Sequence, residues 1–167
     1  RKRAELLAHL AQGDVKRAEA LRREIESDMR SNERDMPEGF EPPAGMPGPS
    51  ERMEGALEEL DGRIHLAKGE LLEGHAKLAS AAERQFEHFM DDPPHDAQFL
   101  YTTLGEHHLE HGNHGLAIEC FERTLEKIPN DAFALSGLAR AHLAVGDIDA
   151  AKRAAGQLRH VWSDAEP

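Results

Sequence analysis

The sequence predicts an all-α protein built from antiparallel pairs of helices, and three observations support this prediction. Only 5% of the 167 residues are aromatic, and alanine and leucine occupy the apolar positions, which favours close-packed helices over a β-sandwich. Apolar residues recur at helical spacing through the longer segments. Glycines at four points along the chain are accompanied by the same residue types at fixed offsets. Such internal repetition is typical of stacked helical hairpins.

Residues 1–30 are predicted to form a helical hairpin. Gly13 and Asp14 separate its two helices, because glycine permits a turn and aspartate caps a helix start. The apolar faces of the two helices carry Leu6, Leu7, Leu10, Ala18, Leu21 and Ile25. Two helices of this size bury too little apolar surface to be stable alone. Residues 31–50 hold five prolines and three glycines and are predicted to be a linker.

Residues 51–90 are predicted to be strongly helical, with a heptad-like apolar stripe. The stripe consists of Met53, Leu57, Leu60, Ile64, Ala67, Leu71, Gly74 and Leu78. Gly55, Gly62 and Gly69 recur every seven residues on the face away from this stripe, so either another element approaches that face closely or the repetition is accidental. The segment forms either one long helix or a hairpin that turns near Gly74-His75. The repeat favours the hairpin.

The repeat becomes visible when the glycines at positions 13, 74, 112 and 146 are aligned. Five residues after these glycines stand Ala18, Ala79, Ala117 and Ala151. Three residues before them stand Leu10, Leu71, Leu109 and Leu143. Eight residues before three of them stand Leu66, Leu104 and Leu138, each followed by a small residue. Small residues let two helices approach, and the leucines fill the space beside them.

The segment 98–131 resembles the tetratricopeptide repeat, a helix-turn-helix of 34 residues. The matching residues are Tyr101, Leu104-Gly105, Ala117, Phe121 and Pro129. Segments 132–165 and about 60–93 follow the pattern less fully, and 1–30 only in its second half. The resemblance implies a domain over 51–167 in which three units form a right-handed α-solenoid.

The resemblance also implies a concave groove lined by the first helix of each unit. Its residues would be Phe99, Thr102, Glu106, Leu109, Glu110, Phe133, Ser136, Arg140, Leu143 and Ala144. Phe99 and Phe133 would either grip an apolar side chain of a partner or pack between the repeats. Glu106 and Glu110 would repel an acidic chain terminus. The implied partner is therefore a basic or apolar protein segment.

The formal net charge of -12 argues against nucleic-acid and anionic-membrane partners, because both need a cationic face. Residues 1–30 carry eight Lys/Arg and six Asp/Glu, which gives +2, so the other 137 residues carry -14. The basic segment is drawn either to the rest of the chain or to an acidic neighbour, or it is an ordinary salt-bridged surface helix. No apolar run approaches the roughly 20 residues of a membrane span, so a soluble protein without direct membrane insertion is expected. No targeting signal is visible in a chain that begins at Arg1, and the compartment stays open.

Four histidines within residues 107–114 form the one candidate metal site. His107 and His111 share a helix face, and His114 and His75 are further candidates for a Zn²⁺, Cu²⁺ or Ni²⁺ site. The alternative is structural, because His9, His108 and His142 occupy one repeat position that usually holds an aromatic ring. No other cofactor is predicted.

Nothing else in the sequence favours catalysis, since glycine-rich phosphate loops and nucleophile motifs are missing from it. The single cysteine, Cys120, is predicted to be a buried thiol. The sequence therefore predicts a scaffold, not an enzyme, that binds another protein as a subunit or accessory factor of a larger complex. The alternatives are a metal- or cofactor-associated helical subunit and a scaffold that self-associates through its C-terminal unit, where Trp162 lies.

Overall fold

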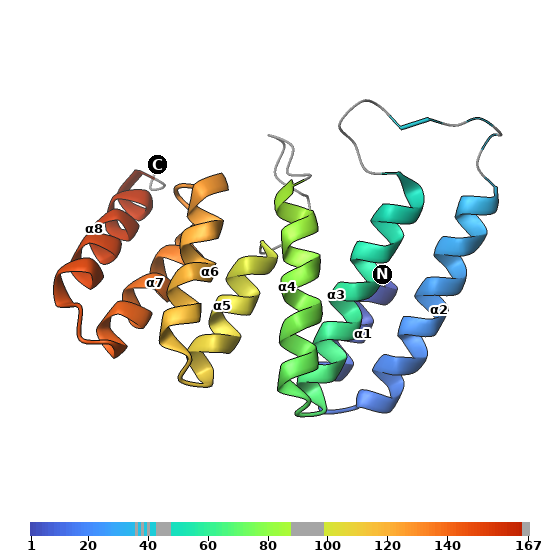
Figure 1. The fold of residues 1–167 in the computed structure, drawn as a ribbon, viewed down its shortest axis with the longest axis horizontal. Helices are drawn as coiled ribbons and strands as arrows, with labels where there is room; N and C mark the ends of the chain where they lie inside the picture. Colours follow the sequence, from blue (N-terminus) through green and yellow to red (C-terminus); the bar gives the residue numbers. More distant parts are fainter. Residues whose placement is uncertain (36, 38, 40, 43–47, 88–98, 165–167) are drawn as a thin grey trace. The chain divides into compact units, whose positions relative to one another are not determined.

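A computed structural model describes residues 1–35, 37, 39, 41–42, 48–87 and 99–164, and these residues form eight α-helices and no strand (Figure 1). The predicted all-α class is confirmed. The helices are α1 (Lys2–Ala11), α2 (Val15–Arg34), α3 (Pro49–Ala67), α4 (Leu71–Glu87), α5 (Leu100–Glu110), α6 (His114–Lys127), α7 (Ala132–Ala144) and α8 (Ile148–Asp164). They fall into two compact units, Arg1–His88 (unit 1) and Phe89–Pro167 (unit 2). This division differs from the expected domain boundaries at residues 30 and 50.

The two helices of each hairpin (α1–α2, α3–α4, α5–α6 and α7–α8) are joined by a tight turn around a glycine in the left-handed region. These glycines are Gly13, Gly69, Gly112 and Gly146, with φ of +76°, +80°, +75° and +82°. In the first turn, the Gly13 N–H donates to the Leu10 carbonyl at 3.0 Å and the Asp14 N–H donates to the His9 carbonyl at 2.9 Å. The other three turns repeat both bonds at equivalent positions. All four turns are therefore Schellman motifs, in which a positive φ favours glycine.

The turn between α3 and α4 lies at Gly69, so the predicted turn near Gly74-His75 is wrong. Gly74 is a buried residue inside α4. With Gly69 in the alignment, His65 joins His9, His108 and His142 four residues before each turn glycine. The shared sequence is then His-Leu-x-x-Gly, followed by Asp, Glu or Asn. The hairpin runs from Pro49 to Glu87 and does not coincide with the expected unit at about 60–93.

In unit 1, α1 and α2 pack on α3 and share one apolar core with it. The buried members of that core are Leu6, Ala18, Leu21, Leu60 and Ile64. The N-terminal hairpin therefore obtains from α3 the apolar contacts that it lacks by itself. Helix α2 continues four residues beyond the expected hairpin, to Arg34.

Ion pairs also tie the basic N-terminal segment to α3. Arg3 Nη2 lies 2.9 Å from Glu59 Oε1, and Arg22 contacts both carboxylate oxygens of Asp61 at 2.7 and 2.8 Å. The hydrogen bond to Asp61 is the main reason that the pKa of Arg22 is raised. These contacts show that the basic N-terminal segment is attracted to the rest of the chain, which is one of the alternatives that the sequence left open.

The three glycines spaced by seven residues have three different surroundings. Gly62 is buried where α4 crosses it, and a Cβ there would lie 2.9 Å from Leu78 Cγ and 3.1 Å from the Gly74 carbonyl oxygen. Gly69 forms the turn. A Cβ on Gly55 would meet only Arg84 Cδ, at an ordinary 3.7 Å. A close approach exists, therefore, at Gly62 alone.

In unit 2, Phe121 of α6 is fully buried between two neighbouring helices. A Cβ built on Gly105 of α5 would lie 2.8 Å from its ring, and one built on Gly137 of α7 would lie 2.3 Å from it. Helix α7 packs against both α5 and α6, so the second hairpin of unit 2 lies on the first. The missing side chains of the two glycines make room for the phenylalanine ring between them.

Candidate functional site

The face shared by α5 and α7 contains the residues that the sequence assigned to a groove. Two of them are not accessible on this face, because Phe99 is 2% exposed and Thr102 is fully buried. The Thr124 hydroxyl donates to the Cys120 carbonyl at 3.3 Å, and the Thr102 hydroxyl lies 3.0 Å from Thr124 Oγ1. Both hydroxyls thus satisfy their hydrogen-bonding capacity inside unit 2.

Two charged members of the predicted groove pair with each other. Arg140 Nη1 lies 3.1 and 2.9 Å from the two carboxylate oxygens of Glu106. The two residues are 34 positions apart and occupy the same place on α5 and α7. The charges of Glu106 and Arg140 therefore compensate each other. The other predicted groove carboxylate is Glu110, which is exposed at the end of α5 and can attract a cation.

Helix α7 presents the largest exposed apolar side chains of this face. Phe133 is 63% exposed and Leu143 is 56% exposed, whereas Leu109 of α5 packs against the core of unit 2. Phe133, Ser136, Arg140 and Leu143 follow the spacing i, i+3, i+7 and i+10, which places them on one side of the helix. The accessible part of the predicted groove is therefore mostly a stripe along α7.

The predicted metal ligands belong to several elements: His107 to α5, His111 to its C-cap, His114 to α6 and His75 to α4. The rings of His107 and His111 stack with centroids 4.2 Å apart, and His111 Nδ1 lies 2.8 Å from the His107 carbonyl oxygen. Among the described residues, no three His, Cys, Asp or Glu side chains form a group that could hold a metal ion.

Two of the four turn histidines, His9 and His65, lie beside the acidic residue that follows their turn glycine. His9 Nδ1 lies 3.4 Å from Asp14 Oδ2, while Asp14 Oδ1 accepts the hydrogen bond from the Arg17 N–H that caps α2. In the second hairpin, His65 Nδ1 lies 2.5 Å from Glu70 Oε2. Sequence reasoning missed His65 because it aligned Gly74, although the repeated His-Leu-x-x-Gly sequence contained the signal.

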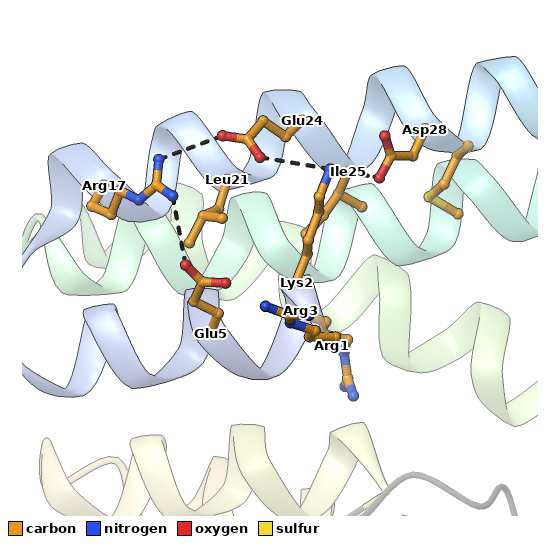
Figure 2. Close-up of a pocket in the computed structure, with 10 residues that line it drawn as sticks. Arg1, Lys2, Arg3, Glu5, Arg17, Leu21, Glu24, Ile25 and Asp28 are labelled. Carbon is orange, nitrogen blue, oxygen red and sulfur yellow. Dashed lines mark hydrogen bonds and ion pairs between the residues drawn. The ribbon is translucent and has the colours of Figure 1, made fainter.

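A cavity of about 550 Å³ between α1 and α2 was not predicted (Figure 2). Its walls include Leu21 and Ile25, and charged side chains surround its rim. Lys2 Nζ lies 2.7 Å from Asp28 Oδ2 and 3.6 Å from Glu24 Oε2, and Figure 2 shows it reaching across to α2. The hydrogen bond to Asp28 raises the pKa of Lys2. Around this rim, Lys2 and Arg17 form ion pairs with Glu5, Glu24 and Asp28.

Cys120 is buried in α6, as predicted, and desolvation is the main reason that its pKa rises to about 12. A thiol with this pKa is almost never a thiolate at neutral pH, and the thiolate is the reactive form.

We expect iodoacetamide at pH 8 to modify native Cys120 at least about a hundredfold more slowly than the urea-unfolded chain, because burial suppresses the thiolate. The chain has one cysteine, so mass spectrometry gives the modified fraction directly. The free energy of unfolding should also fall between pH 9 and about 12, where the thiol ionises only in the unfolded chain. Cys120→Ala should remove that contribution. Equal rates of modification in the native and unfolded states would contradict the buried placement.

The fold and this face define an all-α protein of helical hairpins with an exposed apolar and charged stripe on one of its helices. No described helix is long and apolar enough to cross a membrane. Comparison with known proteins finds no matching family model, no matching curated protein and no matching solved structure.

Proposed function

We propose that α5–α8 are two hairpins of the tetratricopeptide type and that the protein is a binding scaffold, not an enzyme. The 34-residue register of Glu106 and Arg140 supports this proposal, since the repeat has the same length. The packing of Phe121 against Gly105 supports it as well, because both residues stand at signature positions of that repeat. Further units of the same type would extend this stack into a solenoid.

The exposure of Phe133 is the observation that carries the proposed function. A phenylalanine that is 63% exposed on a well-packed helix gains little from its own fold, whereas aromatic side chains are prominent anchors of protein interfaces. Leu143 lies ten residues along α7, which is about 15 Å at the rise of an α-helix. An extended segment of about five residues spans this length.

The charges of the stripe define the partner segment further. Glu110 is exposed at the end of α5, and Arg140 is compensated by Glu106. A segment with an apolar side chain for Phe133 and a lysine or arginine towards Glu110 fits this arrangement. An acidic segment does not, because it would meet the exposed carboxylate of Glu110.

A photocrosslinking amino acid at position 133 tests this function in extracts of the native source. We expect it to capture one protein, through a segment that mass spectrometry identifies as apolar and basic. The same amino acid at Leu72, which is 87% exposed in unit 1, is the matched control and should not capture that protein. Glu110→Lys should weaken the capture about tenfold or more. Equal capture from both positions, or capture through an acidic segment, would refute the proposed function.

A further inference from the structure

Most of helix α8 is free of carboxylates, although Asp149 lies in its first turn. Between Ala150 and Ser163 it carries Lys152, Arg153 and Arg159 and no carboxylate, although the chain as a whole holds 32 acidic and 20 basic residues. All three cations are exposed, and none makes an ion pair within the part of the chain that the structure describes. Exposed cations without partners leave a local positive field on an acidic protein.

The 34-residue register shows which side of α8 is uncovered. On α6, Ile118 and Leu125 pack against the apolar cluster that joins α6 to α7. Their equivalents on α8 are Lys152 and Arg159. Helix α7 therefore covers this side of α6 in the first hairpin of unit 2. On the equivalent side of α8 in the second hairpin, cationic residues replace the two apolar ones.

Large apolar side chains accompany these cations. Leu143 corresponds to Leu109, and Trp162, which is 65% exposed, corresponds to the partly buried Ile128. Ile148, at the start of α8, is about half exposed as well. The surface therefore combines apolar contacts with two flanking positive charges, and we call Leu143, Ile148, Lys152, Arg159 and Trp162 the α8 face.

We propose that the α8 face binds an amphipathic helix of a partner protein whose apolar stripe is flanked by Asp and Glu. A helix is the shape that fits, because α7 occupies the equivalent place on the preceding hairpin (Figure 1). Acidic flanks provide the complementary charges for Lys152 and Arg159. This surface shares Leu143 with the α7 stripe, but its two cations, Lys152 and Arg159, lie on α8, so the inference does not rest on the proposed function.

A second copy of the chain fits this face less well. An occupant from a second copy would need a row of exposed apolar side chains together with carboxylates. Helices α5 and α6 carry the helical glutamates of unit 2, and Leu116 of α6 is the one large apolar residue of these two helices that is strongly exposed. A single leucine buries little apolar area, and stable interfaces need a well-packed apolar centre.

Two designed peptides test the proposal. Both peptides are helical and have the same apolar stripe, with the spacing of the α7 residues that pack against α6. One peptide carries glutamate on both sides of the stripe, and the other carries lysine there. Trp162 is the only tryptophan of the chain, so its fluorescence reports contact at the α8 face directly. We expect the glutamate peptide to shift this emission to the blue and to bind about tenfold or more tightly than the lysine peptide. Its affinity should fall with added salt.

The variant Lys152→Glu/Arg159→Glu should reverse this preference. Both positions are exposed, so the circular dichroism spectrum should stay unchanged. The variant Lys16→Glu/Arg23→Glu changes the net charge equally at exposed positions of unit 1 and should keep the preference for glutamate. Equal binding of both peptides, or reversal by the unit 1 variant, would overturn the proposal. A concentration-dependent dimer abolished by Lys152→Glu/Arg159→Glu would do so too, because it assigns the face to a second copy.

Discussion

Replacing Phe121 with alanine is expected to destabilise unit 2 by about 3–5 kcal/mol. The ring is fully buried and lies against both Gly105 and Gly137, so its removal leaves a cavity that neither glycine can fill. Urea unfolding followed by the fluorescence of Trp162 measures this change, because the single tryptophan lies in unit 2. Hydrogen exchange should show the loss of protection in α5, α6 and α7 together.

Phe133→Ala is the matched control, since it removes the same atoms from a side chain that is 63% exposed. Its free energy of unfolding should stay within about 0.5 kcal/mol of the wild type. The same variant should lose the partner captured through position 133. Similar losses of stability in the two variants would mean that Phe121 is not the residue that joins the helices of unit 2.

Replacing Gly74 with alanine is expected to destabilise unit 1 by about 1–3 kcal/mol. The added Cβ would lie 2.5 Å from Leu66 Cδ2 and 2.9 Å from the Leu66 backbone nitrogen. A side-chain end can rotate away, but the backbone nitrogen belongs to α3, so the two helices would have to separate. Thermal unfolding by circular dichroism, with hydrogen exchange over residues 49–87, measures the effect.

Gly55→Ala, in the same unit, is expected to stabilise the protein instead. Its Cβ would meet only Arg84 Cδ at 3.7 Å, so the better helix propensity of alanine should stabilise α3 by up to about 1 kcal/mol. The two substitutions add the same methyl group to the interior of neighbouring helices. Changes of the same sign would show that helix propensity, and not the approach of α3 to α4, controls both positions.

The repeat was visible in the sequence, but its register was only partly recoverable. Spacing from Gly13, Gly112 and Gly146 located three turns correctly, because a left-handed turn residue is marked by glycine in the sequence itself. Gly69 and Gly74 are both glycines near the middle of a helical segment, and the alanine offset favoured the wrong one. The backbone bonds that close the turn at Gly69 decide between them.

The prediction of the candidate groove was also only partly correct. Helical spacing grouped Phe133, Arg140 and Leu143 on one side of α7, and the structure leaves all three exposed. The same logic included Phe99 and Thr102, which are buried. Periodicity assigns a residue to a helix face, but it does not say whether a neighbouring helix covers that face.

The sequence by itself determined that the chain forms helices, where three of its turns lie and which residues repeat. These features depend on local backbone preferences and on apolar periodicity, and short stretches of residues determine both. Only the tertiary structure decided that the N-terminal hairpin packs on α3, that Gly74 and not Gly55 faces a crowded backbone, and that α8 keeps an open cationic face. Each of these depends on contacts between segments distant in the chain, and an exposed lysine or a buried glycine has no local sequence signal that reveals what lies beside it.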